Sequence, residues 1–179
     1  MSNETEHVST KGDPSVPGIV GQRIFVIGFL IFFLSSIVYV LVFGFQVVNK
    51  AKTNAVETDS ALRTVAWAIM VQAATDGEFP TGQGGLVDAT SVQTLPGGYT
   101  GTEGSPLPTD RNQAMAGAPQ MGLDEAMEIL VVEWPPDGSL APVLTTGGRP
   151  SGIGTLTEVN TWLVGLARTM SARGSQDGA

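Results

Sequence analysis

The sequence predicts an α+β protein. A long N-terminal helix, transmembrane in its first part and amphipathic in its second, is expected to pack on a small antiparallel β-sheet, with a C-terminal helix after it. Three patterns indicate this fold class: an uncharged apolar block over residues 24–48, a helical repeat of apolar residues that follows it, and two short apolar runs around a Pro-Pro-Asp-Gly turn at residues 135–138.

Composition excludes several classes of function. The 179 residues include 9 Lys and Arg against 17 Asp and Glu, so there is no electrostatic drive toward nucleic acid or anionic lipid headgroups. Cysteine is absent, which excludes disulfides, thiolate metal sites and a cysteine nucleophile. A membrane segment in a chain of this length leaves about a hundred residues for one small soluble domain.

The N-terminal part divides into a polar tail and a membrane helix. Residues 1–23 are polar, and the first 21 lack any periodicity that could bury a face, so we expect them to be disordered when alone. Residues 24–48 carry no ionisable group, and a helix rising ~1.5 Å per residue lets them cross a hydrocarbon core of roughly 30 Å. This run is longer than the apolar core of a cleaved secretory signal, so we expect a retained anchor. Orientation does not follow from charge, because basic residues lie on both sides of the span.

Aromatic and small residues within the span are the candidate membrane contacts. Three phenylalanines recur on one helical face, and three small residues could let another helix approach closely. Lipid contact is the simpler interpretation of the aromatic face, and a neighbouring helix or an embedded pigment or quinone is the alternative. The candidate residues are Phe25, Gly28, Phe29, Phe32, Ser36 and Gly44.

Residues 49–80 predict a continuing amphipathic helix that ends in a turn. Val56, Leu62, Val65, Ile69 and Ala73 approximate one face at helical spacing. The dipeptide at residues 76–77 is expected to end the helix, and the proline at residue 80 prevents it from resuming.

Three stretches of this region carry a family resemblance. Residues 62–70 form a run of small and aliphatic residues, Asp76, Gly77, Phe79 and Pro80 form a turn that continues into Thr81, and residues 83–86 read Gln-Gly-Gly-Leu. Together these stretches resemble the end of the long helix in type II secretion pseudopilins, which are type IV pilin-like proteins. The resemblance covers roughly residues 24–86.

The resemblance implies a pilin-like fold in the bacterial inner membrane. It places the N-terminus in the cytoplasm and the C-terminal domain in the periplasm. Two family features differ here: no basic leader ending in Gly precedes the span, and Gly28 occupies the position of the glutamate that pairs with a neighbouring subunit in the filament. The Asp-rich calcium site of many major pseudopilins has no counterpart near Asp137.

The remaining sequence predicts loops, a hairpin and a final helix. Residues 81–120 are rich in Gly and Pro and are expected to form an irregular loop region. Residues 121–154 form a small hairpin region, with a helical turn at 121–126, a strand at 127–134 and a returning strand at 139–145. The loop region is expected to be fixed by Leu86, Val92, Leu95 and Tyr99.

Residues 155–174 predict an amphipathic C-terminal helix, and residues 175–179 a tail. Thr155 and Glu158 fit a capping box, and an apolar face with Val159 and Met170 follows them. We expect this helix to pack on the chain's own sheet, because so small a sheet needs a cover. The alternative is a contact with a partner protein through Trp162, Leu163 and Leu166.

No grouping of residues predicts chemistry. The single histidine, His7, lies in the polar tail, and the sequence has no metal-binding, Walker or dinucleotide motif. Asp124, Glu125 and Glu128 have the spacing of a solvated helical turn. We expect no catalytic residue, no cofactor, no metal and no nucleic-acid partner.

Three functions fit these patterns. The first is a non-catalytic, single-pass accessory subunit with an uncleaved pilin-like helix, embedded in a secretory, respiratory or photosynthetic membrane complex and contacting other subunits and the lipid bilayer. The second is a divergent pseudopilin or minor pilin. The third is a membrane-tethered periplasmic module that binds a ligand through residues 81–120.

Overall fold

The computed structural model describes residues 18–101 and 107–177 and divides the chain into two compact units, which meet between Val47 and Val48. Helix α1 (Gly18–Asp76) contributes to both units. It begins six residues before the expected start of the membrane helix at residue 24. Gln22 and Arg23 are polar and separate Ile19 and Val20 from the apolar block, so the sequence pattern did not indicate this earlier start. The prediction of disorder for residues 1–17 lies outside the described residues.

In unit 2, α1 is the central helix of the core. Every side chain between residues 58 and 74 is at least partly buried. Leu62, Val65, Ile69 and Ala73 are fully buried, as the apolar face predicts, whereas Val56, at the start of that face, is 40% exposed. Burial extends to the other faces as well, so an amphipathic helix with one buried face is the wrong description of this part. Small side chains explain the difference, because Ala61, Ala66 and Ala68 let other segments approach closely.

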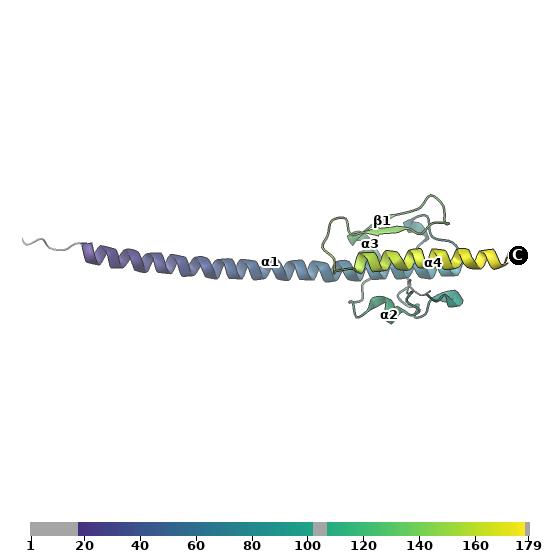
Figure 1. Cartoon of the computed structure of the whole chain (residues 1–179), viewed down its shortest axis with the longest axis horizontal. Helices are drawn as coiled ribbons and strands as arrows, with labels where there is room; N and C mark the ends of the chain where they lie inside the picture. Colours follow the sequence, from purple (N-terminus) through teal and green to yellow (C-terminus); the bar gives the residue numbers. More distant parts are fainter. Residues whose placement is uncertain (1–17, 102–106, 178–179) are drawn as a thin grey trace, which may run out of the picture. The chain divides into compact units, whose positions relative to one another are not determined.

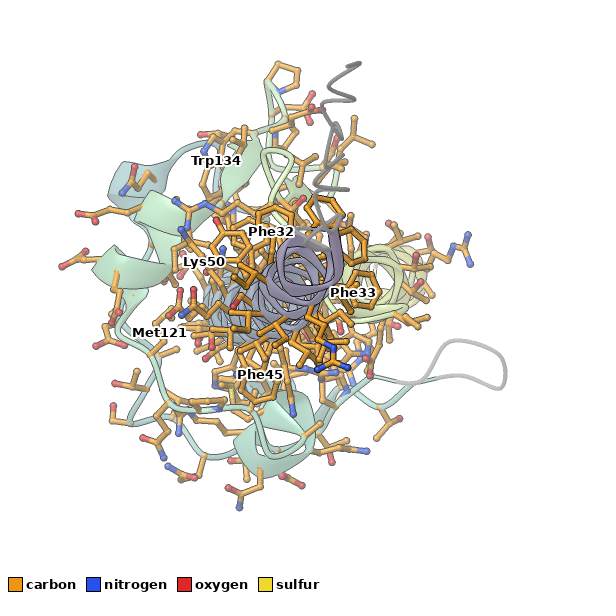
Figure 2. The ribbon with its side chains drawn as sticks, turned by 90° about the vertical axis from the view of Figure 1, so that its left-hand side faces the viewer. Phe32, Phe33, Phe45, Lys50, Met121 and Trp134 are labelled. Atoms are coloured by element: carbon orange, nitrogen blue, oxygen red, sulfur yellow. The ribbon has the colours of Figure 1, made fainter. Side chains whose placement is uncertain are left out.

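The rest of unit 2 surrounds this helix (Figures 1 and 2). Helix α2 (Arg111–Met115) lies on one side of α1, and α3 (Leu123–Ile129) and strand β1 (Val131–Glu133) lie on the other. Helix α4 (Thr155–Asp177) runs alongside α1. Buried residues from α1, α2, α3, β2 and α4 form one hydrophobic core.

The predicted loop region contains more regular structure than expected. Two 3₁₀ turns, η1 (Gln83–Gly85) and η2 (Pro96–Gly98), and helix α2 lie within it. Asp110 caps α2 by accepting a 2.8 Å hydrogen bond from the backbone N–H of Gln113. Five helical residues are too few to show a periodic pattern, which explains why the sequence did not predict α2. The four expected anchors do pack against the core: Leu95 is buried, and Leu86, Val92 and Tyr99 are partly buried.

The expected strand at residues 127–134 is mostly wrong. Residues 127–129 belong to α3, and β1 has only three residues. The predicted helical turn at residues 121–126 overlaps α3, where Leu123 and Ala126 are both buried and lie three residues apart, and the helix continues from this turn to Ile129. The returning strand is also shorter, because β2 (Val143–Thr145) starts after Pro142, which has no N–H to donate.

The sheet consists of β1 and β2 as an antiparallel pair, with Val132 opposite Leu144. The side chain of Asn160 on α4 bonds the backbone of Leu144 twice: its Oδ1 accepts from the N–H at 2.9 Å, and its Nδ2 donates to the C=O at 3.0 Å. Asn160 therefore takes the place of a third strand and fixes α4 to the sheet. The coarse α+β prediction is confirmed.

Helix α4 differs from the prediction at both ends. It extends to Asp177, three residues beyond the expected end at residue 174. The capping box at Thr155 is not formed, because the carboxylate of Glu158 accepts a 2.7 Å hydrogen bond from Arg63 on α1 instead of reaching back along its own helix. An ion pair to the central helix replaces the local cap.

Replacing Asn160 with Leu should destabilise unit 2. The substitution leaves a backbone N–H and C=O of β2 without their partner, which typically costs about 1–3 kcal/mol. Denaturant unfolding of the detergent-solubilised chain measures the change. Thr157→Leu is the matched control, because residue 157 is an exposed position of the same helix, and its effect should stay within about 0.5 kcal/mol. Equal stabilities for the two variants would show that Asn160 does not fix the sheet to α4.

Candidate membrane segment and contact sites

Unit 1 contains a helix whose apolar side chains are not covered by any part of the chain that the structure describes. One helix among the described residues is long and apolar enough to cross a membrane, and none of its most apolar window is buried. The large apolar side chains between residues 24 and 48 are 41–74% exposed. Exposing so many aliphatic and aromatic side chains to water is unfavourable by about 25 cal/mol per Å². This segment is therefore a candidate membrane span.

The predicted contact residues lie along this exposed helix. Phe25, Phe29 and Phe32 are all exposed, as is Ser36. A Cβ added at Gly28 would meet no other atom within 4 Å, and the same holds for Gly44. Among the described residues nothing requires glycine at residues 28 and 44, which leaves a contact outside them as a reason for their small size.

Two aromatic pairs add to the predicted phenylalanine face. The rings of Phe29 and Phe33 stack with their centroids 6.3 Å apart, and Tyr39 and Phe43 stack at the same distance. Phe33 and Phe45 are among the aromatic side chains that Figure 2 labels on this helix. Spacing of four residues brings side chains together on a helix, so this spacing is the signal that predicts both pairs.

The family-motif turn is well defined at the C-terminus of α1. Gly77 has a φ of 81°, and its N–H donates to the carbonyl of Ala73 at 2.9 Å, which closes the last turn of the helix. Phe79 is only 3% exposed and belongs to the core, and its N–H donates to the carbonyl of Gly138 at 2.9 Å. The turn is a core anchor, and its aromatic residue joins α1 to the predicted turn at residues 135–138.

An open cavity of about 380 Å³ lies beside this turn. Its polar lining includes Asp76 and Glu78, and Gln72 donates a hydrogen bond to the carboxylate of Asp76. Glycines line much of the remainder, and Phe79 is its one aromatic lining residue. Ligand pockets are usually lined mainly by apolar and aromatic side chains, so this lining is poorly suited to a small apolar ligand.

The possible partner contacts on α4 are used inside the domain. Leu163 and Leu166 are fully buried, and Trp162 is 4% exposed. Self-packing of the C-terminal helix, the preferred sequence interpretation, is therefore what the structure contains, and these three side chains are not available to a partner.

Arg63 connects three elements around Trp162, a role that the sequence analysis missed. Its guanidinium lies 5.4 Å from the centroid of the Trp162 ring, donates to the carbonyl of Ala114 at 2.8 Å and pairs with Glu158 at 2.7 Å. Glu158 is about half exposed, so the ion pair itself contributes modestly. The value of Arg63 lies in joining α1, α2 and α4 through one side chain.

Ionisable groups do not gather into a reactive site within residues 18–101 and 107–177. No group of three or more His, Asp or Glu residues there could hold a metal ion. Asp124, Glu125 and Glu128 are exposed on α3, as a solvated turn predicts. Hydrogen bonds from the side chain and backbone of Ser139 lower the pKa of Asp137 below its ordinary value. Both residues belong to the same turn, so this shift is a local effect of the turn.

Comparisons with protein-family models, with curated proteins and with solved structures found no match to this chain.

Gly138→Ala tests the contact between the two turns. A Cβ at this position would lie 2.8 Å from the carbonyl oxygen of Phe79 and 3.0 Å from Glu78 Cβ, so the turns must separate. Overpacking of this kind costs typically about 1–3 kcal/mol, measurable by chemical unfolding. Gly84→Ala is the control, because a Cβ there meets nothing within 4 Å. A loss of stability no greater than that of the control would contradict the proposed packing of Phe79.

Proposed function

We propose that this chain is a non-catalytic, single-pass membrane subunit, with an uncleaved pilin-like helix, that serves as an accessory part of a larger membrane complex. One observation supports this most strongly. Helix α1 is fully enclosed by the chain at residues such as Leu62 and Ile69, yet its apolar side chains at residues 24–47 are exposed throughout unit 1. A bilayer is the environment that accommodates a helix of this composition and length.

A structural role is favoured over catalysis by the chemistry that the chain offers. It has one histidine and no cysteine. None of its sequence motifs indicates the group of side chains that acid, base or nucleophilic catalysis needs. The polar side chains with the most connections, Arg63 and Asn160, hold elements of the chain together. Contact with other subunits would use the span and the outer surface of unit 2.

The resemblance to pseudopilins supports a pilin-like origin for the long helix. The helix ends at Asp76 and Gly77, and Phe79 then enters the core, so the motif turn anchors the end of α1. A second candidate function, a divergent pseudopilin or minor pilin, keeps this resemblance and adds processing and filament assembly. We favour the accessory subunit because Gly28 replaces the filament glutamate. By the same resemblance, the chain lies in the bacterial inner membrane with unit 2 in the periplasm.

Cysteine labelling tests the orientation and the processing together. The natural chain contains no cysteine, so Ser2→Cys and Ser175→Cys each introduce the only thiol. A membrane-impermeant maleimide should label S175C in intact bacterial spheroplasts and S2C only after lysis. The reverse pattern would contradict the proposed orientation. Loss of S2C from the mature chain, with a methylated N-terminus near residue 24, would instead establish the pseudopilin function.

Phe29→Lys tests whether the phenylalanine face meets another subunit. Inserting a lysine at the centre of a membrane helix costs about 2.5–3.5 kcal/mol of insertion free energy. The other apolar residues of the span should still keep the variant in the membrane. We expect at least a tenfold loss of co-purification with the complex after mild detergent extraction.

Phe45→Lys is the matched control for this experiment. Residue 45 lies roughly 160° around the helix from residue 29, so the substitution adds the same charge on a different face. Co-purification of F29K at the wild-type level would mean that the face contacts lipid. Equal losses in the two variants would point to a general effect of charge in the span.

A further inference from the structure

A small cavity in the core of unit 2 contains an unpartnered hydroxyl group. The cavity has a volume of about 10 Å³ and lies between α1, the segment at residues 88–90, α2 and α3. The Oγ1 atom of Thr64, on α1, is buried and has no hydrogen-bond partner among the described residues. Thr64 lines the cavity and is only 6% exposed.

Other threonines in the helices donate their hydroxyl to a backbone carbonyl of the same helix, and Thr64 does not. Four of them, on α1 and α4, donate to the carbonyl four residues earlier, at 2.7–2.8 Å; they are Thr58, Thr75, Thr161 and Thr169. A hydroxyl in a helix normally satisfies itself in this way. Leaving it unpaired in the core would cost about 1–3 kcal/mol, so a partner inside the cavity is expected.

The same cavity holds the one buried charged residue of the described chain. Arg111, at the start of α2, is 6% exposed and lines the cavity with Thr64. Its backbone N–H donates to the carbonyl of Gln93 at 2.8 Å, and its guanidinium carries five N–H donors.

The other polar groups around the cavity differ in what they can offer. Trp67 already donates its indole N–H to the carbonyl of Val92 at 3.2 Å. Asp88 accepts a bond from the N–H of Thr90 at 2.9 Å, and its carboxylate keeps further lone pairs. Thr64 therefore supplies a buried polar atom without a partner, and the lining residues Arg111 and Asp88 carry further polar groups. A buried water needs two to four polar partners.

We propose that this cavity binds one ordered water molecule, which pairs with the hydroxyl of Thr64. A volume of about 10 Å³ matches one water sphere and is too small for an organic ligand. The water lies between the central helix, the segment at residues 88–90, α2 and α3. It is a structural component of the core and does not depend on the proposed function.

Thr64→Val tests the proposal through the sign of its effect. Valine keeps the shape of threonine but removes the hydroxyl, so the water loses a partner. Loss of one bond of this kind should lower the Tm of the full chain in detergent by about 3–6 °C. If the cavity is dry, T64V instead removes an unpaired buried hydroxyl, and the Tm should rise or stay the same.

Thr58→Val is the matched control, because Thr58 is also buried on α1 and its hydroxyl bonds within the helix. A Tm for T64V at or above that of T58V would overturn the proposal. A crystal structure of the unmodified chain gives a second test that does not depend on folding of the variants. A water peak within hydrogen-bond distance of Thr64 Oγ1 is expected, and an empty cavity would contradict the assignment.

Discussion

The covering of α1 is the constraint on which the rest of the structure depends. A helix rich in apolar residues on every face must be enclosed, either by its own chain or by a surrounding apolar phase. Unit 2 encloses residues 58–74 with α2, α3, α4 and the sheet, and small residues such as Ala61 and Ala68 make the close approach possible. The described residues supply no such cover for residues 24–47, which is the reason that we propose a bilayer around that part.

A few polar side chains specify how the surrounding elements meet the core helix. Arg63 joins α1 to α2 and α4, and Asn160 replaces a neighbouring strand for Leu144. Asp59 accepts a 2.7 Å bond from the N–H of Gly152, just before α4 begins. At the other end of α4, Arg173 stacks over Tyr99 and donates to the carbonyls of Gly97 and Gly98. These bonds connect segments far apart in sequence, whereas the sheet itself is only two three-residue strands.

The sequence predicts the features that depend on local patterns. The apolar span, the helix end at Asp76-Gly77 and the buried face of α4 follow from composition and periodicity, and the structure contains all three. The enclosed faces of α1 could not be predicted in the same way, because alanine is common on both buried and exposed helix surfaces. The end of α3, residues 127–129, was predicted as the start of a strand because a short run of apolar residues is compatible with both periods.

The candidate contact sites could be predicted less completely than the fold. Exposure of Phe29 and its neighbours follows from their place in the span, but the role of Trp162 depended on whether α4 packs on its own domain. Long-range contacts decided that question: the Arg63 side chain reaches Glu158, 95 residues away in sequence, and no spacing rule predicts such a pairing. The hydroxyl of Thr64 is a similar case, since only the packed core shows that it lacks its usual local partner.

Extraction of native membranes with alkaline carbonate tests the central claim most directly. This treatment releases peripheral proteins and leaves proteins that span the bilayer in the pellet. If residues 24–48 cross the membrane, the intact chain should remain in the pellet and move to the soluble fraction only with detergent. Recovery of the full-length chain in the carbonate supernatant would contradict the account, because the exposed apolar helix would then need a cover other than lipid.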